Sequence, residues 1–429
     1  MKPYSMLKIQ HVMIITAVMA FSTFFWLHVG QHFVYQNQDD RVQHPLINVD
    51  LNNVPKGHRY HKWSGDELSS VITQAELIRK PEGLLMSNSS QANLTVIVTC
   101  TQDGYEQRQT IRKTWGTWLR EHGQNVFFII GRSTPSPVPS KNPSIEAEHK
   151  QHDDIIEYDF VDDYYNLTLK TLFILRFFNE EVLNLRESAR PLKDSISPQA
   201  PILSVAQKKQ YSPAQRFLLK ADDDLVISGP NFMQIIKNLQ QNAQLSNDIG
   251  TILGQVHPAK KPMRDPLNKN FLPETLFPDP DLPDFTTGTA YMISSNAARS
   301  LYVTAVFAKK CPFITNEDVF MTGVCRSNAV KMMDDNTYIP EHRMDIKLLG
   351  HSDFKIVPRD WRADFCNYLS PSLALFGHGL STSEMIQYWS MLNSSEKASE
   401  YCKHNLYSLD APFHNSNSNN NNNNKKYSS

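Results

Sequence analysis

The chain has 429 residues, of which 40% are hydrophobic and 20% charged, so it can bury the core of one large domain or of two ordinary ones. Lysine and arginine number 43 against 44 acidic residues, which gives a formal net charge of -1 at pH 7. Without a global positive field, the chain is not expected to bind nucleic acid.

A charge-free apolar segment, residues 9–30, lies near the N-terminus. A membrane-spanning helix needs about 20 residues, so the segment is long enough to cross a bilayer. Lys2 and Lys8 precede it and the first charges after it are acidic. The positive-inside rule therefore predicts a cytoplasmic tail of residues 1–8, with the rest of the chain on the far side of the membrane. A cleaved signal peptide, which would give a soluble secreted protein, is the alternative.

The remainder has features of a lumenal or extracellular protein. Its five cysteines allow at most two internal disulfides and leave one cysteine over. Four Asn-x-Ser/Thr sequons predict N-glycosylation, at Asn88, Asn93, Asn166 and Asn393.

Three regions follow the apolar segment. Residues 31–92 are polar and lack sustained periodicity, which predicts a stem that acts as a spacer. Residues 93–409 are expected to form the folded domain, whose order begins with a β-branched strand at 94–99. The last stretch, 410–429, is rich in Asn and Ser and predicts a disordered tail.

The first expected helix of the domain, residues 106–119, has an unusual face. Arg108 and Arg112 lie on the same side as Ile111, Trp115 and Leu119. Two arginines beside such apolar residues have two readings. They brace the rim of the strand–helix junction with their stems on the core, or they point at an anionic ligand.

Strands and helices then alternate, which predicts an α/β domain with a mainly parallel sheet. Asn166 is expected to cap a helix over 167–185, and Asn316 a helix that ends at Cys325. An exposed insertion is expected at 186–214. The other expected strands are 126–131, 154–160, 250–256 and 289–294, and the other expected helices are 230–241, 295–304 and 383–392.

The apolar run from Phe217 to Ile227 is interrupted by three consecutive acids, Asp222, Asp223 and Asp224. The run predicts a buried strand, and the acids fall where it ends, the place where open α/β sheets bind ligands. Crowded carboxylates repel one another unless a cation neutralises them. Oxygen ligands suit Mg²⁺ or Mn²⁺, which bridge carboxylates to nucleotide phosphates. A solvated acidic turn is the alternative.

Five blocks of sequence, taken together, resemble the inverting β-1,3-galactosyltransferase/N-acetylglucosaminyltransferase family (glycosyltransferase family 31). They occur in the family's order and span about residues 94–389. The blocks are Arg108-Gln-Thr-Ile111-Arg112-Lys-Thr114-Trp115-Gly116, the segment from Asp159 to Thr171, Lys220-Ala-Asp222-Asp223-Asp224, the segment from Phe285 to Ser294, and Glu317-Asp318-Val319-Phe-Met-Thr-Gly323-Val-Cys325.

The resemblance implies a single GT-A-type catalytic domain behind one transmembrane helix, in a single-pass type II protein of the Golgi membrane. The expected reaction moves galactose, placed ahead of N-acetylglucosamine, from a UDP-sugar to a glycan in β-1,3 linkage, with Mn²⁺ or Mg²⁺ as cofactor. The implied partners are an acceptor glycan on a glycoprotein or glycolipid, the membrane, and further copies of this or other glycosyltransferases. The alternative is a catalytically inactive glycan-binding or scaffold protein of the same fold.

The resemblance also implies roles for individual residues. Asp224, Asp222 and His378 would bind the metal, and Asp318 would be the catalytic base. A lone histidine is more often structural, and acids at a helix start more often serve its N-terminus. The family's usual partner of Cys325 is missing, and Cys311 is the substitute. The nucleotide would contact Asp222, Asp223, Lys220, Arg108 and Arg112, and the sugar loop would comprise Gly288, Tyr291 and Glu317.

Overall fold

The computed structural model describes residues 63–83, 92–133, 142–184, 190–191, 216–241, 250–333, 337–350, 354–355 and 375–406. All of these residues belong to one compact unit, residues 60–429. The expected segments 1–8, 9–30 and 410–429, most of the expected stem and the Asn88 sequon lie outside the described residues. Among the helices of the described ranges, none is both long and apolar enough to span a membrane.

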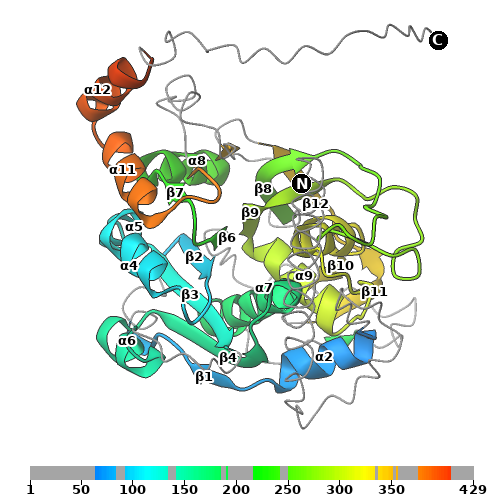
Figure 1. Ribbon diagram of the computed structural model, residues 1–429. Coiled ribbons are helices and arrows are strands. Elements are labelled where there is room, and N and C mark those ends of the chain that lie inside the picture. The colour runs from blue at the N-terminus through cyan, green and yellow to red at the C-terminus, as the bar shows by residue number, and fades with distance from the viewer. Residues whose placement is uncertain are drawn as a thin grey trace, which may run out of the picture. The chain divides into compact units, whose positions relative to one another are not determined.

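An eight-stranded sheet forms the centre of the unit, in the order β1-β4-β3-β2-β6-β9-β8-β12 (Figure 1). The neighbours β4, β3, β2 and β6 run parallel, as do β8 and β12, whereas β1 and β9 are antiparallel to their neighbours. The expected α/β class with a mainly parallel sheet is confirmed. The strands are β1 (Leu77–Arg79), β2 (Leu94–Thr99), β3 (Asn125–Arg132), β4 (Ile155–Val161), β6 (Phe217–Asp222), β8 (Gly250–His257), β9 (Phe285–Ser294) and β12 (Ile346–Gly350).

Helices cover both faces of this sheet because successive strand residues point to opposite sides. On β2, Ile97 belongs to one buried cluster, and Val96 and Val98 belong to the other. Figure 1 shows the two groups of helices on either side of the sheet. The first cluster includes α2 (Gly65–Gln74), α7 (Leu167–Phe177) and α9 (Ser295–Val306); the second includes α4 (Tyr105–Lys113), α5 (Trp115–Glu121), α8 (Gly229–Gln241) and α11 (Thr382–Leu392).

Smaller elements complete the described fold. Two three-stranded sheets have the orders β10-β11-β5 and β13-β14-β7. Within the expected insertion, only residues 190–191 are described, and they form β5. These sheets comprise β5 (Arg190–Pro191), β7 (Val226–Ile227), β10 (Val330–Met332), β11 (Thr337–Arg343), β13 (Phe354–Lys355) and β14 (Leu375–Phe376); the remaining helices are α6 (Ile145–His152) and α12 (Ser395–Leu406).

Ordered structure begins before Leu94, which corrects the expected boundary of the stem at residue 92. Helix α2 starts with a capping box between Ser64 and Glu67 and buries Leu68 and Ile72 in the first cluster. Strand β1 pairs with β4. The segment is too short to show sustained periodicity, but it is part of the folded domain.

Two helices depart from expectation. The one expected over 106–119 breaks at Thr114, whose hydroxyl donates to the Thr110 carbonyl at 2.7 Å, a bond that bends helices. The one expected over 167–185 ends in a π-helical segment, η3 (Phe178–Val182). The caps differ too. The Asn166 side chain donates to Val161 O at 2.9 Å, and Asp163 caps the preceding turn, η2 (Tyr164–Asn166).

The segment before Cys325 is also π-helical, η5 (Val319–Cys325). The helix opens at Glu317 and Asp318, as expected, and Asn316 directly precedes it. The Asn316 carbonyl accepts from the Phe320 amide at 2.8 Å, whereas its side chain donates to Asn270 O. A disulfide between Cys311 and Cys325 closes the loop that contains Asp318, as expected from the resemblance. Cys402 is also disulfide-bonded, and Cys100 is a buried free thiol.

Strand register decides which residues meet at one edge of the sheet. Thr99 and Asp222, the last residues of two parallel strands, are direct partners. Strand β9 runs antiparallel to β6, so its beginning, near Gly288, lies at the same edge. The carboxyl ends of β2 and β6 and the start of β9 therefore surround one location.

Candidate active site at the carboxyl end of the sheet

Asp222 ends β6 with its side chain fixed by two neighbours. Its Oδ1 accepts from Lys220 Nζ at 2.6 Å and from Thr99 Oγ1 at 3.0 Å. Both of these hydrogen bonds go to the same oxygen. Oδ2 therefore remains for a ligand outside the sheet.

Asp223 is half-buried, next to the buried Cys100 thiol. Burial, together with the charges of Asp224 and Asp222, raises the pKa of Asp223 to about 6. Burial and Asp223 likewise raise the pKa of Cys100. Because its pKa is raised whereas that of Asp224 is lowered, Asp223 is a weaker candidate than Asp224 to hold a cation.

Asp224 faces the loop before α11. Its Oδ2 accepts from the Gly379 amide at 2.9 Å and lies 3.6 Å from His378 Nδ1. Burial alone would raise the pKa of Asp224, but His378 and the Gly379 amide lower it. Its Oδ1 is buried and accepts no hydrogen bond from the residues that the structure describes. A buried carboxylate oxygen without a donor is costly unless a ligand satisfies it.

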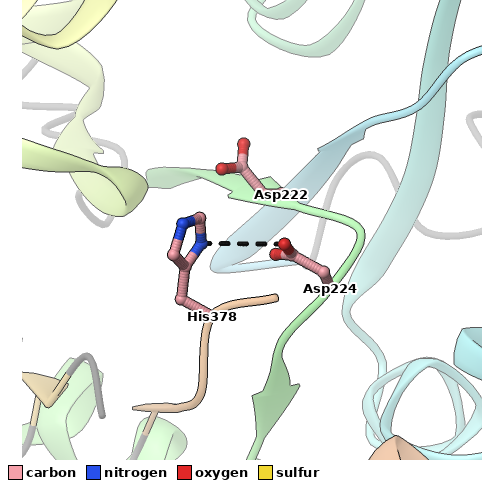
Figure 2. Close-up of side chains that lie close together, drawn as sticks. All are labelled: Asp222, Asp224 and His378. Atoms are coloured by element: carbon pink, nitrogen blue, oxygen red, sulfur yellow. Dashed lines mark ion pairs between the residues drawn. The ribbon is translucent and has the colours of Figure 1, made fainter. Parts of the chain in front are cut away.

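His378 reaches the acids from a tight turn. Its neighbours Gly377 and Gly379 have φ angles of 88° and 71°, which strongly favour glycine. The ring is exposed, and its Nδ1 also lies 3.3 Å from Thr289 Oγ1. The neighbouring Asp224 carboxylate raises the pKa of His378, although burial opposes the shift. Figure 2 shows His378 and Asp224 pointing toward each other beside Asp222.

The donor set fits a divalent cation. One ligand atom each from Asp222, Asp224 and His378 lies within 4.8 Å of the others. The orphaned Asp224 Oδ1 is an acceptor that nothing else satisfies. Two carboxylates and an imidazole match the preferences of Mn²⁺, and the carboxylates suit Mg²⁺ as well. The residues present therefore fit the metal that the sequence predicts.

Asp318 lies beside Gly288, whose carbonyl accepts from Lys220 Nζ at 2.6 Å. Its Oδ1 accepts from the Val319 amide at 2.8 Å, and the backbone amide of Gly288 lies near the carboxylate. Burial raises the pKa of Asp318 above its ordinary value, against the effect of these two amides. The carboxylate thus serves a helix start and is also a stronger base than a solvated aspartate.

Glu317 and Tyr291 form a buried pair below the site. The Tyr291 hydroxyl donates to Glu317 Oε1. Glu317 Oε2 accepts no hydrogen bond and lies 3.7 Å from Lys220 Nζ. Burial raises the pKa of Glu317 to about 7, although Lys220 opposes the shift. Both side chains are too buried to touch a sugar as they stand, so they shape the site from beneath.

Arg108 and Arg112 are held in a buried ion-pair network. Arg108 binds both oxygens of Glu148, at 2.8 and 2.7 Å. Arg112 binds both oxygens of Asp154, at 2.9 and 2.8 Å, and also Glu148. Of the two roles expected from sequence, this geometry matches bracing of the strand–helix junction.

The rim of the site includes an exposed aromatic ring. Tyr164 is 57% exposed and packs edge-to-face on Tyr165, with a centroid separation of 5.5 Å. Lys269 Nζ lies 5.9 Å from the Tyr164 centroid. Burial raises the pKa of Tyr164, and the charges of Asp318 and Asp222 add to the effect, so the ring stands near both acids.

Three described sequons differ in accessibility. Asn393 is exposed, although its amide donates to Trp389 O at 2.8 Å. Attaching a glycan at Asn166 requires its bond to Val161 O to break, and the hydroxyl of Thr168 in that sequon is buried against Ile314 O. Asn93 is half-buried at the start of β2. N-glycosylation stays a prediction at all of these positions.

The residues that sequence analysis missed are those that hold the acids. Thr99 bonds to Asp222, Thr289 lies against His378, and Gly379 donates to Asp224. A signal for Thr99 was present, since it ends the first expected strand and parallel strands end at one edge. Nothing local indicates that Thr289 meets a histidine 89 positions away.

Two carboxylates, an imidazole and a separate basic carboxylate thus lie at one edge of an α/β sheet, where open sheets of this kind bind ligands. Residues 106–186 and 202–335, half of the chain, match the galactosyltransferase family. The chain therefore belongs to the galactosyltransferase family. The unmatched gap falls within the expected insertion at 186–214.

Curated relatives are similar over different lengths. A human lactosylceramide 1,3-N-acetyl-beta-D-glucosaminyltransferase is 26% identical over 331 residues, covering 75% of this chain and 74% of the relative. The rat protein of that name is 28% identical, covering 57% of this chain and 56% of the relative. Human beta-1,3-galactosyltransferase 5 is 25% identical, covering 70% of this chain and 79% of the relative. The chain spans from about half to three quarters of these relatives.

Proposed function

We propose that the chain is an inverting, metal-dependent glycosyltransferase that moves a hexose from a UDP-sugar to a glycan hydroxyl in β-1,3 linkage. The observation that carries the proposal is the pairing of a cation-binding cluster with a separate basic carboxylate, Asp318, beside Gly288. Membership of the galactosyltransferase family supports glycosyl transfer. The names of relatives that transfer N-acetylglucosamine or galactose support the 1,3 linkage and leave two donors to test.

The cluster and the base have different tasks in this reaction. A bound Mn²⁺ or Mg²⁺, held by Asp222, Asp224 and His378, would supply charge neutralisation at the departing diphosphate. Asp318 takes the proton of the acceptor hydroxyl as that oxygen bonds to the sugar's anomeric carbon. The bond between this carbon and the phosphate oxygen breaks, and UDP leaves with the electron pair. In-line displacement inverts the anomeric centre, as in inverting glycosidases.

The acceptor and the setting of the reaction belong to the same proposal. A glycan acceptor on a glycolipid is supported by the name of the human relative, which refers to lactosylceramide, and an acceptor on a glycoprotein is part of the same proposal. A type II protein of the Golgi membrane, anchored by residues 9–30, is supported by the charge-free apolar segment and its flanking charges. Asp318 keeps its place beside the cluster, and this favours an enzyme over an inactive glycan-binding protein.

A donor-by-acceptor screen tests the proposal. The purified full-length protein is incubated with UDP-galactose, UDP-N-acetylglucosamine or UDP-N-acetylgalactosamine and with galactose- or N-acetylglucosamine-terminated glycans, in Mn²⁺ and in EDTA. The expected result is one donor–acceptor pair that gives a β-1,3 product by NMR, in Mn²⁺ only. Metal-dependent UDP binding without transfer or donor hydrolysis would support the inactive alternative.

A further inference from the structure

Lys220 is a buried cation at the centre of the site. Its side chain is 1% exposed on β6, and its Nζ lies among carboxylates from two elements. Nζ donates to Asp222 Oδ1 and to the Gly288 carbonyl, both at 2.6 Å, and lies 3.7 Å from Glu317 Oε2. With every donor directed into the protein, Lys220 does not reach out to the nucleotide, the role that its sequence block implies.

The first contact of Lys220 fixes a metal ligand. Asp222 Oδ1 is shared between Lys220 and Thr99, at 2.6 and 3.0 Å. Two donors on one oxygen set the rotation of the carboxylate and leave Oδ2 for the cation. Donors that orient metal ligands in this way typically change metal affinity or activity by about 10–100-fold when they are removed.

The second contact reaches the base through one residue. Lys220 binds the carbonyl of Gly288, and the side chain of Asp318 lies against the Cα of the same residue. A Cβ at Gly288 would lie 3.3 Å from Asp318 Cβ and 3.4 Å from Glu317 Oε2, so only glycine allows this approach without displacement. One ammonium group thereby touches the metal ligand directly and the base through a single residue.

We propose that Lys220 is a positioning residue that sets the metal ligand Asp222 and the base Asp318 relative to each other, the latter through Gly288. The inference rests on the proposed function, because it assigns Asp222 to the metal and Asp318 to proton transfer. It goes further by naming Lys220 as the group that links the metal ligand to the base. The competing explanation is that Lys220 merely balances the charge of Glu317.

A charge-neutral double variant separates these explanations. At pH 8, above the Glu317 pKa of about 7, Lys220→Met/Glu317→Gln removes one positive and one negative charge, so the local net charge is unchanged. Glu317→Gln alone is the matched control, since it keeps Lys220 on Asp222 and Gly288. If Lys220 only balances Glu317, the double variant should behave as the control. If Lys220 is a positioning residue, the double variant should lose metal affinity that the control retains.

The measurement is Mn²⁺ binding to the purified full-length protein, followed by electron paramagnetic resonance of free Mn²⁺ with no donor present. We expect the Kd for Mn²⁺ to rise at least about tenfold in Lys220→Met/Glu317→Gln and to stay within about twofold of wild type in the control. Equal Kd values for the two variants would overturn the inference. Asp224→Asn, run alongside, reports on the proposed metal site itself. If Asp224→Asn binds Mn²⁺ like wild type, the proposed function fails instead.

Turnover at saturating Mn²⁺ tests the contact with the base. We expect kcat of the double variant to remain below that of Glu317→Gln even when Mn²⁺ saturates both, because Asp318 loses its support through Gly288. Equal kcat values for the double variant and Glu317→Gln would show that Lys220 does not position Asp318. Should the double variant fail to fold, Thr99→Val removes the other donor to Asp222 without a charge change. A several-fold rise in its Kd for Mn²⁺ is expected, and an unchanged Kd would overturn the positioning of Asp222.

Discussion

Three acids in a row have three different environments at this site. Asp222 is bound by a lysine and a threonine, half-buried Asp223 has a pKa of about 6, and Asp224 directs Oδ2 toward His378 and Gly379. The chemical roles therefore follow from neighbours supplied by other elements. The acids themselves are identical in the sequence.

Asp318→Asn tests the base. The substitution keeps the size of the side chain and its acceptance from the Val319 amide, but the amide group takes no proton at neutral pH. The rate of transfer should fall by about 10²–10⁴-fold, the usual contribution of general-base assistance. UDP and Mn²⁺ binding should barely change, as measured by titration calorimetry.

Glu317→Gln is the control for that substitution. Its Oε1 continues to accept from Tyr291, so we expect a mild effect on transfer. A near-wild-type rate for Asp318→Asn, or a loss of UDP binding in proportion to its loss of activity, would show that Asp318 is not the catalytic base. Asp162 would be a poor replacement, because it is paired with Lys170 at 2.6 Å.

The sequence identifies the acids and His378 at the residue scale but not the residues that orient them. The acidic triplet follows an apolar run, and this local pattern is enough to predict a site. The contact between Lys220 and Gly288 joins residues 68 positions apart and depends on the antiparallel pairing of β6 with β9. The alternation of strands and helices in the sequence suggests a sheet that is parallel throughout. In such a sheet the start of β9 would not lie at the carboxyl end of β6.

At the scale of elements, one ion-pair network joins α4, α6 and the start of β4. Glu148 is buried between Arg108 and Arg112, and Asp154 binds Arg112 and Arg120. Removing one member of a buried network leaves its partners unpaired, which is costlier than the pair is stabilising. The network therefore holds the first strand–helix junction behind the site.

Glu148→Gln should lower the free energy of unfolding at pH 7 by about 3–5 kcal/mol. Burial alone would raise the pKa of Glu148, but the two arginines lower it. Because the pKa of Glu148 is lower in the folded state, its ionised carboxylate stabilises the folded state at pH values above the unfolded-state pKa of about 4.3. This stabilisation is lost as the pH falls through the folded-state pKa. Denaturant unfolding measured at pH 7 and below pH 4 should therefore show that the difference in free energy of unfolding between Glu148→Gln and wild type becomes smaller at acid pH.

The exposed Glu146 on the same helix supplies the matched control. Glu146→Gln should change the free energy of unfolding by no more than about 0.5 kcal/mol, as for other surface positions. If Glu148→Gln were as stable as Glu146→Gln at pH 7, the network would not support the junction.

Elements with strong local signals were predicted and those fixed by tertiary packing were not. The strand at 94–99 and the helix start at Leu167 are both found in the structure. The break at Thr114 depends on a side-chain hydrogen bond, and the π-helical ends of two helices have no sequence period of their own. Strand β1 is too short to recognise before its pairing with β4 is known.

At the scale of the molecule, the Cys311–Cys325 disulfide encloses the base. The bridge spans 14 residues, and Asp318 lies between the two cysteines. A loop of that length is stabilised by about 3 kcal/mol in the chain-entropy account. The bridge should therefore matter for the stability of the segment that presents Asp318.

Cys311→Ala/Cys325→Ala should reduce the free energy of unfolding by about 3 kcal/mol, measured by denaturant unfolding. Cys100→Ala is the control, because that thiol is buried but unpaired. Equal stability of the double variant and wild type would show that the bridge adds nothing to the fold.

The central claim is that a divalent cation bound at Asp222, Asp224 and His378 makes sugar transfer possible. Its most direct test measures transfer from the preferred UDP-sugar by wild type and by Asp224→Asn over a range of Mn²⁺ concentrations, with the thermal midpoint of each. Wild type should be active in Mn²⁺ and silent in EDTA, whereas folded Asp224→Asn should lose Mn²⁺-dependent transfer. Undiminished transfer by Asp224→Asn, or by wild type in EDTA, would contradict the claim.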